Sequence, residues 1–355
     1  MGEPLNILIV KMSAIGDVIH TLPALNALRR QFPNARITWL VEEAAADMIY
    51  GHPSLDRVIL SKRKLWIQQL FSPRYSQAFK SILSFIKELR DTEYDMVLDF
   101  QGLLKSGIMV MLTRGKQKIG FDKGMAHAEN SHLFYNVRIP PVSMEIHALK
   151  RGLLLLENLG ISTGEVTYNL AVSPKERQAL DLLLERAGID LNDPIICINP
   201  QATWQTKLWH NQKFADLADR LKHRYKAQIV FTGGRDDQDE VEAILSMMKE
   251  QGTNLAGLTS LKTLTALFQR AFLLVTTDTG PMHLGAAVGI KVLAIFGATA
   301  PWRTGPYGRN SRVVRAGIDC SPCFKRHCPT SMECMERISV ERVMKGIATL
   351  VEEQP

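Results

Sequence analysis

Apolar and polar residues alternate along the first half of the chain in a way that predicts strands separated by helices. Residues 5–10 (LNILIV) form a short apolar run typical of a buried strand, and a helix is expected from there to about Gln31. Because Pro23 lacks a backbone N–H, we expect regular helix to begin only near Thr21, after a shaped turn over 16–20. Further strands are expected at 36–41, 57–60, 95–99 and 114–121. This alternation is typical of a parallel, doubly wound sheet.

The second half repeats the alternation after a loosely patterned segment at 161–171. Ser173 and Glu176 have the spacing of a capping box, and they should open a helix that ends near Gly188. The remaining elements are expected strands at 195–199, 227–232, 254–257, 272–275 and 291–296, with helices between them, and a last amphipathic helix at 340–353.

The whole pattern predicts an α/β protein with two doubly wound, Rossmann-like domains, 1–170 and 171–338, and a C-terminal helix at 339–355. Two such domains facing each other across a cleft are the GT-B architecture of nucleotide-sugar transferases. In such sheets ligands bind at the carboxyl ends of the strands. The loops that follow the strands are therefore where a site is expected.

Composition and net charge limit the cellular location and the kinds of binding partner that we expect. The chain has 355 residues, 46% of them hydrophobic, which is enough for two cores. No run approaches the roughly 18 apolar residues of a membrane span, and no basic-then-apolar leader precedes Leu5, so we expect a cytoplasmic protein. The net charge of +7 favours anionic partners, but it is spread over both halves, and neither half resembles a nucleic-acid-binding domain.

Residues 61–90 interrupt the regular alternation with seven basic residues, one acidic residue and interleaved aromatic residues. Positions 75–90 have helical spacing of apolar side chains and predict an amphipathic helix. Two interpretations remain open: a helix packed on the sheet with a solvated basic face, or a surface that contacts anionic lipid head groups or a phosphorylated substrate.

The segment 276–287 (TTDTGPMHLGAA) joins two buried strands through a short helix, with Pro281 expected in its first turn. Thr279 and Gly280 would then lie at a helix N-terminus, whose free N–H groups and partial positive charge suit a phosphate or pyrophosphate. Asp278 can accept a hydrogen bond from a sugar hydroxyl. An ordinary strand–turn–helix connection is the alternative.

Other strand-end loops carry polar residues. Lys207, in the loop 199–209, is a candidate to neutralise a phosphate, although a solvated lysine is a common alternative. Gln101 and Lys105 follow the strand at 95–99 and can reach a ligand there. The loop 233–237 is a candidate to hold a ribose or a base. The DxD spelling at 237–239 falls at a helix start, where acidic residues favour the dipole, so we reject metal binding there.

Five motifs together resemble the ADP-heptose:lipopolysaccharide heptosyltransferases of glycosyltransferase family 9. They occur in family order and span nearly the whole chain: MSAIGDVIHTLPAL (12–25), DFQGLLKSG (99–107), LFYN (133–136), ATWQTKLW (202–209) and DTGPMHLGAA (278–287). DFQGLLKSG, followed by GFD (120–122) and LFYN, looks most like heptosyltransferase I.

The resemblance implies an inverting, metal-independent transfer of heptose from ADP-heptose to the Kdo or inner-core region of lipopolysaccharide, with no cofactor. It also implies a lipid-linked acceptor in the N-terminal domain, the donor in the C-terminal domain, and a peripheral enzyme at the inner face of the cytoplasmic membrane. Asp17 matches the catalytic base, with helix capping as its structural alternative.

The same resemblance assigns the remaining site residues. The donor-binding set is Thr203, Lys207, Asp278, Thr279, Gly280 and His283, in which Lys207 contacts the phosphates and acts in catalysis. The acceptor-binding set is Ser13, Gly16, Gln101 and Lys105.

The chain also departs from the family pattern. The segment 125–132 lacks the arginine usual in heptosyltransferase I, with His127 near its place, and Ala202 replaces a second threonine. A heptosyltransferase II-like enzyme, a family 9 enzyme for another sugar, and a nucleotide-sugar epimerase remain alternatives. A nicotinamide oxidoreductase would need a GxGxxG after the first strand, which KMSAIGD lacks.

Four cysteines near the end of the chain, Cys320, Cys323, Cys328 and Cys334, have the spacing C-x2-C-x4-C-x5-C and look more like heptosyltransferase II. Four thiolates can hold zinc or an iron–sulfur cluster, or they can be free or partly oxidised thiols. We expect this loop to lie away from the strand ends that form the site, and we assign no metal.

Overall fold

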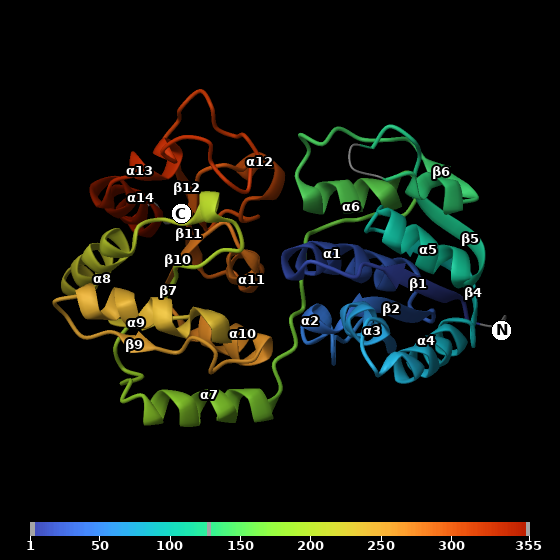
Figure 1. Ribbon diagram of the computed structural model, residues 1–355, viewed down its shortest axis with the longest axis horizontal. Coiled ribbons are helices and arrows are strands. Elements are labelled where there is room, and N and C mark those ends of the chain that lie inside the picture. Colours follow the sequence, from blue (N-terminus) through green and yellow to red (C-terminus); the bar gives the residue numbers. More distant parts are fainter. Residues whose placement is uncertain (1–3, 126–128, 353–355) are drawn as a thin grey trace. The chain divides into compact units, whose positions relative to one another are not determined.

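The computed structural model describes residues 4–125 and 129–352, and the chain divides into two compact units, Met1–Ala171 and Val172–Pro355 (Figure 1). The first unit is built on a parallel six-stranded sheet with the order β3-β2-β1-β4-β5-β6. Its strands are β1 (Asn6–Val10), β2 (Arg36–Glu42), β3 (Arg57–Ser61), β4 (Glu93–Asp99), β5 (Arg114–Phe121) and β6 (Val137–Ile139).

Helices connect these strands and cover the apolar runs from which the strands were predicted. They are α1 (Ile15–Gln31), α2 (Glu43–Ala46), α3 (Arg63–Leu70), α4 (Tyr75–Leu89), α5 (Leu104–Leu112) and α6 (Ala148–Glu157), with a 3-10 turn η1 (Ser131–Phe134). Leu8 and Val10 of β1 pack in one core cluster with Phe85 and Leu89 of α4. Since successive strand residues point to opposite faces, both faces of β1 are covered.

The start of α1 differs from the sequence prediction. The helix begins at Ile15, not near Thr21, and continues through Pro23 without a break. The residues from Val18 to Leu28 are all buried, so packing on both sides of Pro23 outweighs the hydrogen bond that proline cannot donate. Asp17 is consequently the third helical residue, and Ala14 occupies the N-cap position.

The second unit has a sheet of the same kind, with the order β12-β11-β10-β7-β8-β9. Its strands are β7 (Ile195–Asn199), β8 (Gln228–Phe231), β9 (Thr253–Asn254), β10 (Leu273–Thr277), β11 (Lys291–Phe296) and β12 (Ser311–Arg315). Its helices are α7 (Pro174–Arg186), α8 (Asn211–Tyr225), α9 (Gln238–Met247), α10 (Leu261–Arg270), α11 (Gly280–Val288), α12 (Pro301–Thr304), α13 (Glu333–Glu336) and α14 (Val340–Glu352), with 3-10 turns η2 (Gln205–Lys207) and η3 (Arg235–Asp237).

Several local predictions for this unit are confirmed. Ser173 and Glu176 form the capping box that opens α7, and Pro281 lies in the first turn of α11. The last helix is part of the second core, where Val343 and Ile347 of α14 pack in one cluster with Leu293 and Ile295 of β11. Strands β6 and β12, each at one edge of its sheet, had no counterpart in the sequence prediction.

Both sheets reverse their winding direction at one position. In the first sheet the reversal falls between β1 and β4, where Val10 pairs with Asp99, and in the second between β7 and β10, where Asn199 pairs with Thr276. At such a point the loops after the two strands diverge to opposite faces of the sheet and leave a crevice. Each unit therefore has one topologically favoured position for a ligand.

Candidate functional site

The crevice of the first unit contains a cavity of about 260 Å³. Polar residues at its walls come from the loop after β1, from α1, from the end of β4 and the loop after it, and from α6, and they include Lys11, Asp17, His20, Asp99, Gln101 and Arg151. Apolar residues such as Phe100 and Met144 complete it. The cavity lies at the carboxyl ends of β1 and β4 and is lined by two cationic and two acidic side chains.

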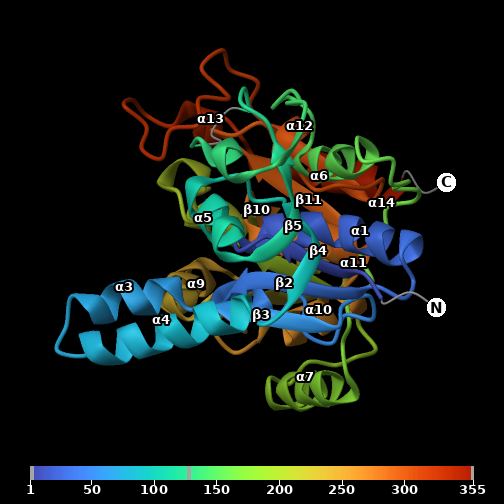
Figure 2. The same cartoon turned by 90° about the vertical axis from the view of Figure 1, so that its right-hand side faces the viewer.

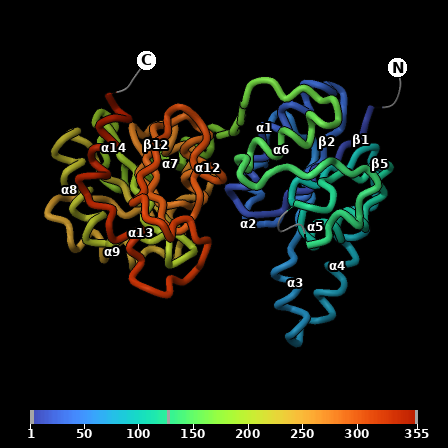
Figure 3. Tube along the Cα trace, turned by 90° about the horizontal axis from the view of Figure 1, so that it is seen from above, coloured from blue at the N-terminus to red at the C-terminus, as the bar shows by residue number. Residues whose placement is uncertain are grey.

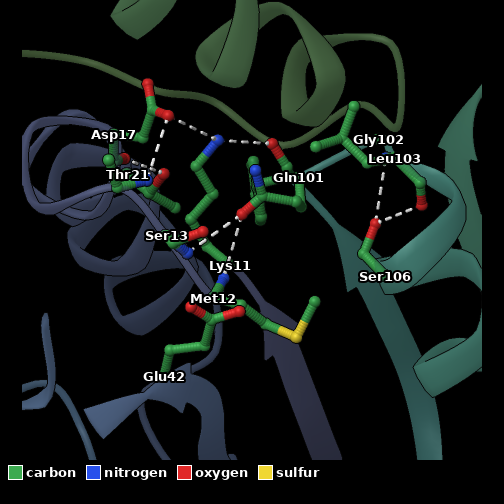
Figure 4. Close-up of polar contacts among 12 residues, drawn as sticks. Lys11, Met12, Ser13, Asp17, Thr21, Glu42, Gln101, Gly102, Leu103 and Ser106 are labelled. Carbon is green, nitrogen blue, oxygen red and sulfur yellow. Dashed lines mark hydrogen bonds and ion pairs between the residues drawn. The ribbon is translucent and has the colours of Figure 1, made fainter. Parts of the chain in front are cut away.

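The carboxylate of Asp17, at the N-terminus of α1, makes fixed contacts and is still exposed. One of its carboxylate oxygens, Oδ2, accepts a hydrogen bond from the backbone N–H of Ala14 at 3.3 Å and lies 3.9 Å from Nζ of Lys11 (Figure 4). The Asp17 side chain is 42% exposed and that of Lys11 only 11%. Lys11 is itself fixed, because its ammonium donates to the carbonyl of Phe100 at 3.1 Å. The carboxylate is therefore positioned and still accessible from the cavity.

Gln101 joins the two loops of the crevice. Its side-chain oxygen accepts from the backbone N–H groups of Met12 and Ser13, both at 3.1 Å (Figure 4). Gly102 adopts a φ of +65°, a left-handed conformation that favours glycine. In the segment DFQG (99–102), the glycine thus permits a sharp turn after β4, and the glutamine side chain binds the loop after β1.

Asp99 supports this turn from below. Its Oδ1 accepts from the N–H of Gln101 at 2.8 Å and of Gly102 at 3.0 Å, and its Oδ2 accepts from the hydroxyl of Tyr135 at 2.8 Å. The side chain is buried, and burial raises the pKa of Asp99, although these hydrogen bonds act in the opposite direction. Asp99 is thus a shaping group beneath the cavity.

The other predicted acceptor residues lie beside the cavity lining. Lys105 donates to Oγ of Ser13 at 2.7 Å and lies 3.4 Å from Oε1 of Glu42, which Arg63 also contacts at 3.2 Å. Gly16 is buried in the first turn of α1. Gln101 is thus in the cavity, whereas Ser13 and Lys105 form an adjacent polar cluster with Glu42.

In the second unit, Lys207 and Asp278 meet at the reversal of the sheet. Nζ of Lys207, at the end of η2, lies 2.7 Å from Oδ2 of Asp278, which directly follows β10. The same oxygen accepts from the hydroxyl of Thr299 at 2.6 Å. Asp278 is 5% exposed at its side chain, and Lys207, 17% exposed, lies 4.6 Å from the centre of the Trp204 ring. Asp278 therefore uses one of its carboxylate oxygens to hold Lys207.

The N-terminus of α11 lies next to this pair. Thr279 is its N-cap in an extended conformation, Gly280 is the first helical residue, and His283 is buried in the first turn. Thr203, by contrast, is exposed in the loop before η2. The helix terminus and the ammonium of Lys207 together offer a positive potential and N–H donors to an anion.

The cysteine-rich loop contacts the loop 199–209, which carries Lys207. This corrects the expectation that the cysteine-rich loop lies away from the strand ends that form the site. The buried hydroxyl of Thr206, in η2, donates to the carbonyl of Lys325 at 2.6 Å, and His327 lies 3.3 Å from Gln205. The N–H group of Cys323 donates to the carbonyl of Ala298, shortly after β11, at 3.0 Å. Because these partners are far apart in sequence, no local pattern could have predicted the contact.

The four cysteines of this loop line one cavity of about 560 Å³. All five cysteines are free thiols. In residues 4–125 and 129–352, no group of three or more His, Cys, Asp or Glu side chains is arranged to hold a metal ion. Burial and the neighbouring thiols raise the pKa of Cys334, whereas a hydrogen bond to Thr330 lowers the pKa of Cys328.

Several residues of the two sites were not candidates in the sequence analysis, among them Lys11, Asp99, Arg151 and Thr299. Lys11 directly follows the buried strand β1, and Asp99 is the last residue of the buried strand β4. Their position at strand ends is therefore the sequence signal that could have found them. Arg151 is on a helix and Thr299 in a loop after β11, and no motif marked them. His127, suggested as a replacement for an arginine, lies outside the described residues.

Two parallel Rossmann-like sheets, each with polar residues at its reversal point, form the GT-B fold, and the similar solved structures share this fold. Residues 82–333 match glycosyltransferase family 9 (heptosyltransferase). The chain belongs to this family, and the family and enzyme class predicted from the motifs are confirmed.

The chain is 30% identical over 365 residues to lipopolysaccharide heptosyltransferase 1 of Pseudomonas aeruginosa, covering 98% of both chains. A glycosyltransferase family 9 structure from Veillonella parvula superimposes with a TM-score of 0.82 at 23% identity, covering 100% of this chain and 99% of the other. The E. coli heptosyltransferase WaaC with ADP gives a TM-score of 0.76 at 25% identity, covering 98% and 100%. WaaC with ADP-2-deoxy-2-fluoro heptose gives 0.73 at 25%, covering 97% and 99%.

Proposed function

We propose that this protein transfers heptose from ADP-heptose to the Kdo or inner-core region of lipopolysaccharide, with inversion at the anomeric carbon. The observation that carries the proposal is that one unit has a fixed cationic group at the reversal point of its sheet, and the other unit has an accessible carboxylate at the reversal point of its own sheet. The relatives support the choice of donor, since WaaC was solved with ADP and with an ADP-heptose analogue.

Lys207 and the N-terminus of α11 would bind the diphosphate. Asp278, which itself accepts a hydrogen bond from Thr299, holds the Lys207 ammonium in place before the donor arrives, so little side-chain entropy is lost when the phosphates bind. As the sugar–phosphate bond breaks, negative charge grows on the departing ADP. A fixed positive group stabilises that charge in the transition state, which is the role we assign to Lys207.

Asp17 would act as the general base. A hydroxyl oxygen of the acceptor attacks the anomeric carbon of heptose, the bond to the ADP oxygen breaks with its electron pair on ADP, and the hydroxyl proton passes to Asp17. Lys11 keeps the carboxylate in position by its contact at 3.9 Å. A single displacement of this kind inverts the anomeric configuration.

The acceptor would occupy the cavity of the first unit. Lys11 and Arg151 place two positive charges at its wall, which complement the carboxylate of an acidic sugar such as Kdo. Gln101 adds an amide and fixes the loop that carries Ser13. We place the reaction on the cytoplasmic side, with the enzyme bound peripherally to the inner membrane. Among the described residues, no helix combines the length and hydrophobicity needed to cross a bilayer.

The test is a transfer assay with the purified full-length protein, ADP-heptose and Kdo-lipid A, read by mass spectrometry. We expect a product heavier by one heptose residue, the same rate in excess chelator, and an inverted linkage by NMR. Transfer only to an acceptor that already carries heptose would identify a heptosyltransferase II-like enzyme. Transfer from a UDP-sugar in preference to ADP-heptose would contradict the proposal.

A further inference from the structure

A helical hairpin projects from the sheet of the first unit. Helices α3 and α4 run antiparallel beside each other, joined by a short turn at 71–74 (Figures 2 and 3). The rings of Trp66 and Phe85 pack with their centres 4.9 Å apart, and Nε1 of Trp66 donates to Oγ of Ser81 at 2.8 Å. The hairpin therefore has its own internal packing and presents a defined outer surface.

That outer surface is unusually apolar. Phe71, in the turn, is 90% exposed. On α4, Tyr75 is 65%, Phe79 61% and Leu83 53% exposed. These three residues follow each other at intervals of four, so they form one stripe along the helix. Large apolar side chains gathered on one exposed patch mark a surface that contacts a partner or a membrane.

The stripe is exposed because the apolar face of α4 is wider than the surface that α3 and the sheet cover. Its buried residues are Ala78, Phe85 and Leu89, and the last two pack in one core cluster with Trp66 of α3 and with strand residues of the sheet. The apolar face of α4 is wider than this covered strip, because Tyr75, Phe79 and Leu83 continue it on one side. If α4 served only to cover the sheet, polar residues would be expected at these three positions.

The charge of the hairpin indicates what covers the stripe. Between residues 62 and 87 the sequence contains basic residues and no acidic one. Lys62 and Arg63, at the base, pair with Glu43 and Glu42. Four further basic residues form no ion pair with any described residue: Lys64, Arg74, Lys80 and Lys87. Lys80 and Lys87, seven residues apart, lie on one side of the apolar stripe.

We propose that the tip and outer stripe of this hairpin, Phe71, Tyr75, Phe79 and Leu83, insert into the head-group region of an anionic lipid bilayer. The four unpaired basic residues would contact lipid phosphates. Aromatic and apolar side chains beside lysine and arginine are the combination that interfacial helices use. A second copy of the chain fits less well, because two hairpins would bring like charges together without acidic partners. The inference deepens the proposed function, on which it rests for the lipid-linked acceptor.

Flotation of the full-length protein with vesicles tests this directly. Vesicles of phosphatidylglycerol and phosphatidylcholine are compared with vesicles of phosphatidylcholine alone. We expect binding to the anionic vesicles, weakened by salt because exposed charges are screened. The double substitution Phe71→Ser, Phe79→Ser should lower the affinity by at least about tenfold, since two aromatic rings no longer leave water. Lys80→Gln, Lys87→Gln should lower it by about tenfold and reduce the salt dependence.

Leu191→Ser is the matched control, because Leu191 is 56% exposed in the second unit, and its affinity should equal that of the wild type. Thermal unfolding checks that each variant is folded. Unchanged vesicle binding by the folded Phe71→Ser, Phe79→Ser variant would overturn the proposal. So would wild-type self-association that this variant abolishes without any vesicle binding.

Transfer to a detergent-solubilised acceptor separates this inference from the proposed function. If the hairpin variants keep that transfer and lose vesicle binding, both proposals are supported. If the wild type lacks transfer but binds vesicles through the hairpin, only the proposed function fails. If transfer is normal and vesicle binding is independent of the hairpin, only this inference fails.

Discussion

Nζ of Lys207 lies 2.7 Å from a carboxylate oxygen of the buried Asp278, so the cation that would meet the donor phosphates is already fixed by the protein. This pair leads to a prediction about donor affinity. Lys207→Ala should weaken ADP binding by about tenfold to a hundredfold, because a charge-assisted hydrogen bond is lost. Asp278→Asn should also weaken it, since the ammonium loses its ionic partner. Isothermal titration calorimetry with ADP measures both.

Lys175→Ala, at an exposed position of α7, is the control for loss of one positive charge in the same unit. It should bind ADP as the wild type does. Equal affinities for Lys207→Ala and Lys175→Ala would show that Lys207 does not contact the donor.

Asp17→Asn tests the base. The amide keeps the size of the side chain but cannot take a proton, so kcat should fall by at least about a hundredfold. ADP affinity should be unchanged, because every predicted donor contact is in the other unit. Steady-state kinetics and calorimetry on the same preparation give both quantities. Asp47→Asn, a half-buried carboxylate at the C-cap of α2, should leave kcat unchanged. A loss of ADP affinity as large as the loss of rate would remove Asp17 from this role.

Asp99→Asn should change how the free energy of unfolding depends on pH. Burial raises the pKa of Asp99 above its ordinary value near 3.8, so the folded state holds a proton that the unfolded state releases. The stabilisation from this group is complete below the ordinary pKa and is lost as pH rises through the raised one. The free energy of unfolding of the wild type should therefore fall, relative to Asp99→Asn, as pH increases above about 4.

Urea unfolding at several pH values measures this difference for Asp99. The asparagine can still accept from Gln101 and Gly102, which keeps the turn intact. A stability difference between the two proteins that does not change with pH would show that Asp99 titrates normally.

Thr206→Val tests the link between the cysteine-rich loop and η2. The substitution removes the hydroxyl that donates to the carbonyl of Lys325 and leaves that carbonyl unpaired, at a cost of about 1–3 kcal/mol. We expect lower stability of the protein and weaker ADP binding, because η2 carries Lys207. Thr206→Ser retains the hydroxyl and should behave nearly as the wild type. Identical ADP binding by both variants would mean that the loop does not influence the donor site.

Much of the fold could be predicted from local patterns. Short apolar runs predicted most strands, the spacing of Ser173 and Glu176 predicted the start of α7, and the helical repeat at 75–90 predicted α4. These features depend on residues close in sequence, whose propensities act without help from the rest of the chain. The family motifs likewise led to Asp17 and Lys207, since each lies in a continuous segment.

The tertiary structure decided what those residues contact. Lys11 reaches the carbonyl of Phe100, 89 positions away, and thereby fixes the group beside Asp17. Thr206 reaches Lys325 across 119 positions, against the expectation that the cysteine-rich loop lies apart. The start of α1 at Ile15 was missed for a related reason, because burial of the helix outweighed the local effect of Pro23. Local sequence determined which elements form, whereas pairings between distant residues, whose energy exists only in the folded chain, determined how the candidate sites are held.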